Sequence, residues 1–247
     1  MWGEAMKTAL KALALIGMGL FLYSRFINGT LFYYINERFL WLILAASLGF
    51  ILVGMSYRYR PQHAHHHEHE EHEHYQFSWF GLFLVLLPVI LGVLAPPKPL
   101  GAAAMVNRDV SIDSLTSAAA PESNTIIAKP KGDRNVLDWL VDFRTAKDPA
   151  AFKGEEAKVI GFVYRDDRFA QEEFMVARFV LSCCAADASP LGLVVRWPEG
   201  ASLADDTWVE VKGHFEPGHF AGEEMPILMA ESVTPTEIPE RPYLYPF

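Results

Sequence analysis

The stretch that decides the fold is Phe39-Leu-Trp-Leu-Ile-Leu-Ala-Ala-Ser-Leu-Gly-Phe-Ile-Leu-Val-Gly-Met-Ser-Tyr57, because its 19 residues carry no charge. A helix rises about 1.5 Å per residue, so a run of this length can cross the roughly 30 Å hydrocarbon core of a bilayer. A second uncharged stretch, Phe77–Pro97, has 21 residues. Together with a hydrophobic share of 51%, these stretches indicate an integral membrane protein.

The amino-terminal residues allow two interpretations. Lys7 and Lys11 precede an uncharged run, Ala12–Ser24, that fits either a signal peptide or a membrane helix. No small-x-small cleavage site follows, and the next aromatic residues are of the kind that sit at a membrane interface, so we expect an uncleaved helix. The predicted spans are Met6–Tyr23, Phe39–Tyr57 and Phe77–Ala95.

Three spans would place the two ends of the chain on opposite sides of the membrane. The Lys and Arg residues that flank the spans number four on each side, so the positive-inside rule does not decide the orientation. Arg58 and Arg60, directly after a strong span, favour a cytoplasmic amino terminus and an extracytoplasmic carboxy-terminal half.

The composition divides the chain into three parts. Residues 1–98 form the membrane region, with a His/Glu-rich loop at 61–76, and residues 99–132 are predicted to be a flexible linker. Residues 133–247 have globular patterning, with a short helix and then five strands. The helix is expected to begin near 135 and to end near Asp148-Pro149, and the strands are expected over 157–164, 173–182, 191–197, 207–215 and 226–233.

Five short strands separated by turn residues favour an OB-like β-barrel, with any other five-stranded antiparallel barrel or sandwich as the alternative. Gly161 and Gly213 are expected where strands bend at corners of the barrel. Trp139, Trp197 and Trp208 are expected in the core.

OB-folds often bind nucleic acid, but the charge of this domain argues against that partner. From residue 133 onward there are 11 Lys and Arg against 21 Asp and Glu, a net charge of −10. A surface this acidic repels the phosphate backbone.

The loop between the second and third predicted spans is rich in metal ligands. Imidazole and carboxylate groups suit Zn²⁺ and its first-row neighbours. We therefore expect this loop to capture a divalent metal ion, with Zn²⁺ as the first candidate. The alternative is a solvated spacer that only separates two helices. The expected ligands are His63, His65, His66, His67, His69, His72, His74, Glu68, Glu70, Glu71 and Glu73.

The adjacent cysteines, Cys183 and Cys184, are the second candidate site, and three interpretations compete. They are small buried apolar residues, or thiolate ligands helped by Asp187, His214 or His219, or a vicinal disulfide or redox pair. Neighbouring residues in a strand point to opposite faces, so shared metal binding would need a strand end or a bulge. We expect the two histidines to be loop or strand-end residues rather than ligands.

The sequence contains no catalytic signature, neither a nucleophile elbow nor a phosphate-binding Gly-rich loop. The acid pairs Asp166-Asp167 and Asp205-Asp206 are expected in turns as solvated charges. We therefore predict that the chain is not an enzyme.

Several segments resemble the bacterial YcgQ-like family, described as permease subunits. They are Pro96–Gly101, Gly161–Asp166, Val176–Ala188 with its Cys-Cys-x-x-Asp run, and Asp206–Gly213. The resemblance implies a membrane anchor with a carboxy-terminal β-rich domain, a larger multi-spanning permease as partner, and a setting in metal-ion homeostasis. By position, Cys183, Cys184 and Asp187 match the motif of the family.

These observations predict an accessory subunit of a two-component membrane permease in divalent metal-ion transport, in contact with membrane lipid and the larger subunit. The alternative is a membrane-anchored binding or redox module that works through the cysteine pair without a permease.

Overall fold

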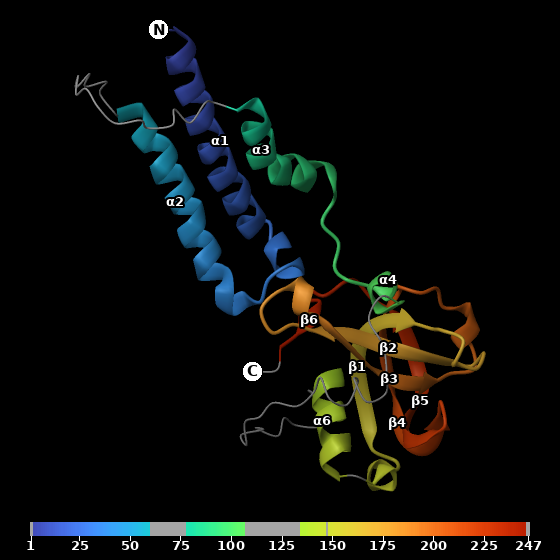
Figure 1. The fold of residues 1–247 in the computed structure, drawn as a ribbon. Coiled ribbons are helices and arrows are strands. Elements are labelled where there is room, and N and C mark those ends of the chain that lie inside the picture. Colours follow the sequence, from blue (N-terminus) through green and yellow to red (C-terminus); the bar gives the residue numbers. More distant parts are fainter. Residues whose placement is uncertain (1, 60–77, 107–133, 147, 246–247) are drawn as a thin grey trace. The chain divides into compact units, whose positions relative to one another are not determined.

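The computed structural model describes residues 2–59, 78–106, 134–146 and 148–245, which divide into two units (Figure 1). One unit contains Met1–Leu31 and Glu37–Lys98. The other contains Phe32–Asn36 and Pro99–Phe247. The segment Phe32–Asn36 therefore folds as part of the carboxy-terminal domain, although in sequence it joins the first two helices.

The first unit is built from three helices, α1 Trp2–Ile27, α2 Leu40–Tyr59 and α3 Trp79–Leu94, with the short helix η2 Glu37–Phe39 before α2. Two segments, Met6–Ile27 and Glu37–Tyr57, are long and apolar enough to cross a membrane. Large apolar side chains on α2 are exposed, such as Trp41 at 65%. Exposure of this kind fits contact with lipid.

The helices α1 and α2 pack against each other along their length (Figure 1). The Ser47 hydroxyl donates a hydrogen bond to the Gly19 carbonyl oxygen at 2.7 Å. A Cβ atom at Gly19 would lie 2.7 Å from the Ser47 carbonyl oxygen, so the absence of a side chain there permits this close approach.

The third predicted span, Phe77–Ala95, is not confirmed. The helix α3 has 16 residues and begins where the Ser78 hydroxyl accepts a hydrogen bond from the Gly81 amide at 3.2 Å. At about 1.5 Å per residue it rises only about 24 Å, which is shorter than a typical hydrocarbon core. The predicted start, Phe77, lies outside the described residues.

The domain contains six strands and several short helices around one core. Its strands are β1 Glu156–Tyr164, β2 Glu173–Val180, β3 Ser189–Arg196, β4 Trp208–Phe220, β5 Glu223–Pro235 and β6 Tyr243–Leu244. Its helices are α4 Ala102–Val106, α6 Val136–Ala146, η4 Pro149–Phe152, η5 Ala185–Asp187 and η6 Gly200–Ser202. The boundary between the two units falls within the short helix η1 Thr30–Tyr33.

The sheet order is β1-β4-β5-β3-β2-β6, and β1 also pairs with β2. The pairings among β1 to β5 therefore run in a ring, antiparallel except for the parallel pair of β3 with β5. The five predicted strands are all present. The strands β4 and β5 extend further than predicted because Pro217 and Pro226 lie opposite each other within the hairpin instead of ending it.

Both predicted bend glycines lie where backbones approach closely. A Cβ atom at Gly161 would lie 2.5 Å from the Ala177 carbonyl oxygen, and one at Gly213 would lie 2.0 Å from that of Met229. The register of β4 against β5 shifts between Lys212 and Gly213, as expected of a β-bulge. A side chain at either position would force the paired strands apart.

The core joins the sheet to α6 and α4. Trp139 of α6 is fully buried, with its ring centroid 4.9 Å from that of Phe215, and Trp208 is also buried, whereas Trp197 is only partly buried. Ala102 and Met105 of α4 belong to the same core. Residues 99–106, predicted as the start of a flexible linker, are therefore part of the domain, and residues 107–132 lie outside the described residues.

Candidate functional site: a thiol loop at the end of β2

The two cysteines follow the end of β2 in a tight reversal, which we call the thiol loop (Ser182–Asp187). Asp187 holds this reversal together with its carboxylate. Its Oδ1 accepts the Ser182 amide at 2.9 Å, and its Oδ2 accepts the amides of Cys183 at 2.7 Å and Cys184 at 3.2 Å. The hydrogen bonds from three successive amides thus turn the chain around one carboxylate.

This arrangement brings both sulfur atoms to the same side of the loop. The Sγ atoms of Cys183 and Cys184 are 3.6 Å apart, and together with a carboxylate oxygen of Asp187 they lie within 4.8 Å of one another. The cysteines are past the last residue of β2, so the alternation of side chains in a strand no longer separates them. The strand end required for shared binding is present.

The thiols are accessible. Cys183 is exposed and Cys184 is partly exposed, and both are free thiols. The interpretation of the pair as small buried core residues is therefore wrong. The reason is local: Leu181 takes the last core position after β2, and the chain then leaves the core.

The raised pKa of Cys183 disfavours nucleophilic chemistry at this loop. The pKa of the Cys183 thiol is raised to about 12, first by its hydrogen bond to Asp187 and then by that to Cys184. Burial raises the pKa of Asp187, but hydrogen bonds from Cys183, Ser182 and Cys184 outweigh it and lower that pKa overall. A reactive or redox-active thiol needs a lowered pKa. A metal ion that binds Cys183 has to displace this proton, so its binding should strengthen as the pH rises.

The segment Phe32–Asn36 pairs with the thiol loop through an isolated β-bridge. Ile35 forms an antiparallel bridge with Cys184, the Asn36 amide donates to the Cys183 carbonyl oxygen at 3.0 Å, and the Ala185 amide donates to the Tyr34 carbonyl oxygen at 2.8 Å. The Asn36 side-chain amide donates to the Ser182 carbonyl oxygen at 3.0 Å, and this residue is only 3% exposed. Sequence reasoning missed this pairing because aromatic residues after a span suggest a membrane interface.

Strand β6 supports the same region. The Tyr243 hydroxyl donates to the Tyr33 carbonyl oxygen at 3.1 Å and accepts the Leu100 amide at 2.8 Å. The Leu181 amide donates to the Leu244 carbonyl oxygen at 3.0 Å, directly before the thiol loop. The domain therefore holds the connection between α1 and α2 and also the segment that follows α3.

The other predicted ligands are not gathered at the thiol loop. His214 lies on β4 with its Nδ1 atom 3.0 Å from Glu231 Oε1, and His219 lies further along the same strand. In the described parts of the chain, the thiol loop holds the one group of three or more metal-capable side chains within reach of a single ion. The His and Glu residues at 63–74 lie outside the described residues, so their capture of metal stays a prediction.

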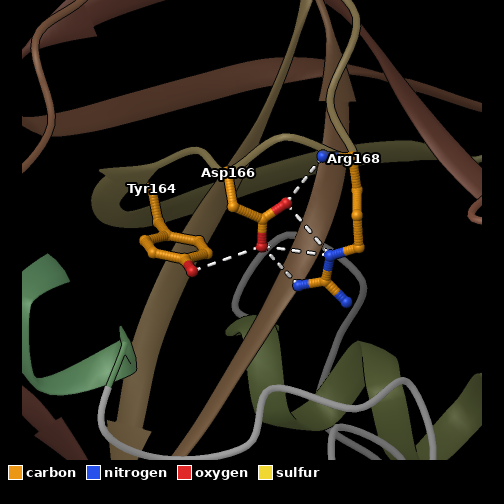
Figure 2. Close-up of polar contacts among 3 residues, drawn as sticks. All are labelled: Tyr164, Asp166 and Arg168. Carbon is orange, nitrogen blue, oxygen red and sulfur yellow. Dashed lines mark hydrogen bonds and ion pairs between the residues drawn. The ribbon is translucent and has the colours of Figure 1, made fainter.

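Figure 2 shows a second polar cluster, in the turn between β1 and β2. The Asp166 carboxylate accepts hydrogen bonds from the Tyr164 hydroxyl at 3.2 Å and from the Arg168 backbone and side chain at 2.6 to 3.0 Å. Burial and the neighbouring Asp166 raise the pKa of Tyr164. With its carboxylate held by these donors, Asp166 stabilises the turn, in agreement with the predicted turn position.

The second acid pair is also structural. Asp206 has a left-handed backbone, φ 64°, in the turn before β4, and its Oδ1 accepts the amide of Ala102. This bond fixes the start of α4 against the domain.

Comparisons with known proteins match nearly the whole chain. The DUF1980 N-terminal domain matches residues 10–111, and the DUF1980 C-terminal domain matches residues 130–246. The UPF0703 protein YcgQ of Bacillus subtilis (strain 168) is 21% identical over 188 residues, which cover 65% of this chain and 66% of that protein. A protein of Streptococcus mutans serotype c, provisionally named a two-component membrane permease complex subunit, is 22% identical over an aligned length of 254, covering 89% of this chain and 92% of that protein. Neither name describes an enzyme.

Proposed function

Because the chain belongs to the YcgQ-like family of DUF1980 proteins, we propose that it is the accessory subunit of a two-component membrane permease for divalent metal ions, with Zn²⁺ as the leading candidate. The permease role follows the name of the Streptococcus relative. The metal role is carried by one observation, the convergence of two thiols and a carboxylate in the thiol loop.

The spacing of the sulfur atoms supports a tetrahedral ion. Zn–S bonds are about 2.3 Å long, so two sulfurs on a tetrahedral ion are about 3.8 Å apart. The Sγ atoms of Cys183 and Cys184 are 3.6 Å apart, so both can bind one ion with little movement. Asp187 supplies an oxygen ligand of the type that completes such sites.

Three ligands leave a fourth position on a tetrahedral ion. Cys183 and Asp187 are exposed, so this position faces solvent and is open to water or to a ligand from a partner. Structural zinc sites are closed by four protein ligands, whereas an open position permits exchange. An open site suits a subunit that receives an ion and passes it on.

The His/Glu-rich loop gives the chain a second place to collect metal. Phe32–Asn36 joins α1 to α2 in the sequence and folds with the domain that contains the thiol loop. In the sequence, the loop at 61–76 follows α2. The proposed topology has three crossings, with α3 as the third, the amino terminus and the loop at 61–76 cytoplasmic, and the domain extracytoplasmic.

The transport path itself is assigned to a larger multi-spanning partner. The described helices that are long enough to cross a membrane number two. A path for ions needs polar groups enclosed by several helices. The ring of pairings among β1 to β5, with its parallel β3–β5 pair, supports an OB-like barrel for the domain. In this proposal the domain contacts the partner.

Affinity purification of the full-length protein in mild detergent tests this proposal. We expect about one Zn²⁺ or similar ion per thiol loop and a co-purifying multi-spanning protein. The Cys183→Ser/Cys184→Ser double variant should keep the partner and lose the ion bound at the thiol loop. Recovery of the native protein alone and free of metal would refute both halves of the proposal.

A further inference from the structure

We propose that metal binding at the thiol loop sets how firmly the domain holds the connection between α1 and α2, so that the metal load of the domain is communicated to the membrane helices. This proposal concerns the regulation of the same site and rests on the proposed function. We call the hydrogen bonds between the thiol loop and residues 34–36 the clamp.

Two of the three metal ligands, Cys183 and Cys184, also take part in the clamp. The amides of Ser182 and Cys183 donate to the Asp187 carboxylate, while the carbonyl oxygens of the same two residues accept hydrogen bonds from Asn36. Cys184 also donates to Asp187 and forms the bridge with Ile35. The inner side of the loop therefore faces the ligand cluster, and the outer side faces the connection.

An ion that needs both sulfurs and the carboxylate at once binds the folded loop and not the opened one. Such an ion stabilises the folded loop by mass action, and an ion at 100 times its dissociation constant lowers the population of the opened form by about 100-fold. Residues 34–36 are held by backbone atoms of this loop, so an ion that keeps the loop folded also slows amide hydrogen exchange at these residues.

The connection is short, so its attachment bears on both helices. Residue 36 directly precedes η2 and α2, and residue 32 lies five residues after the end of α1. Release of the clamp would free the chain between the two helices, and its formation would fix it. The clamp thus has two states, formed and released. A metal ion favours the formed state because it binds all three ligands only when the thiol loop is folded.

Linkage also requires the reverse effect. If metal strengthens the clamp, then weakening the clamp must weaken metal binding by the same factor. Asn36 allows this to be tested, because its side chain bonds the Ser182 carbonyl oxygen and is not among the metal ligands. Asn36→Ala removes a clamp bond and leaves both sulfurs and the carboxylate in place.

Hydrogen-exchange mass spectrometry on the full-length protein in detergent, with and without Zn²⁺, tests the proposal. At saturating Zn²⁺ we expect exchange of the amides at 34–36 and at 182–187 to slow together, by 10- to 100-fold. The Cys183→Ser/Cys184→Ser variant should lose this effect, which separates the thiol loop from the His-rich loop. Asn36→Ala should weaken the cysteine-dependent Zn²⁺ affinity by about 3- to 10-fold, while the control His214→Gln should leave it unchanged.

The outcomes distinguish the two proposals. Cysteine-dependent Zn²⁺ binding with unchanged exchange at 34–36, or with an affinity unchanged by Asn36→Ala, would overturn the coupling and leave the proposed function intact. Absence of cysteine-dependent Zn²⁺ binding would overturn both.

Discussion

Replacing Asp187 with Asn should make Cys183 much more reactive. Asp187 is the leading cause of the raised pKa of the Cys183 thiol, which stands at about 12. An ordinary cysteine has a pKa of about 8.5, and the thiolate is the form that reacts with alkylating reagents. The Asp187→Asn side chain has nearly the same shape, no negative charge and one acceptor oxygen in place of two, so it removes a large part of the opposition to the thiolate.

The expected size follows from the thiolate fraction. At pH 8 a thiol of pKa 12 is ionised in roughly one molecule in ten thousand, and a thiol of pKa 8.5 in roughly one in four. If the carboxylate is responsible for about half of the rise, its neutralisation increases the thiolate fraction by roughly 50-fold. The reaction of Cys183 with iodoacetamide should accelerate by a similar factor.

The assay is the alkylation rate of Cys183 between pH 7 and pH 10, followed by mass spectrometry on metal-free full-length protein. The matched control is Glu231→Gln, which neutralises a carboxylate beside His214 instead of one beside the thiols. An Asp187→Asn rate equal to the native rate at every pH would show that Asp187 does not set the protonation of the thiol loop. A faster rate in the control would point to a general effect of charge.

Three further predictions concern the fold and its topology. Trp139→Ala, at a fully buried position, should lower the free energy of unfolding by about 3 to 5 kcal/mol in denaturant titration. Trp197 is only partly buried, so Trp197→Ala should lower it clearly less, and equal losses would contradict the described core. Gly213→Ala should lower the free energy of unfolding by about 1 to 3 kcal/mol, because its Cβ would meet the Met229 carbonyl oxygen. The control Gly17→Ala, with no atom within 4 Å of its Cβ, should not lower stability, and an unchanged stability in Gly213→Ala would refute the close approach. A membrane-impermeant maleimide should label Cys183 of the native protein from one side of the membrane. It should label Gln62→Cys, introduced into the Cys183→Ser/Cys184→Ser variant, from the other side, and labelling of both from one side would exclude the proposed topology.

The parts of the fold that were predictable are those with a strong periodic signal. Uncharged apolar runs identified the segments of α1 and α2, and alternating apolar residues identified β1 to β5. The strand β6 was missed because its two residues, Tyr243 and Leu244, are too short to show a period. The third span stays unconfirmed, because α3 has 16 residues after its start at Ser78 and the hydropathy run does not reveal this start.

The candidate site was predicted in part. Cys183, Cys184 and Asp187 were identified from their spacing and resemblance, and the structure brings them together. Nothing in the local sequence connects Asn36 with Ser182, because that contact joins residues 146 positions apart. Contacts of this kind depend on the tertiary fold, so the clamp could not have been anticipated.

The most direct test of the central claim is X-ray absorption spectroscopy at the zinc edge, on full-length protein in which the seven histidines of the 61–76 loop are replaced by alanine. Zinc bound at the thiol loop should show two sulfur neighbours at about 2.3 Å, with oxygen or nitrogen completing the shell. Zinc with only oxygen and nitrogen neighbours, or no retained zinc, would contradict the assignment of Cys183, Cys184 and Asp187 as a metal site.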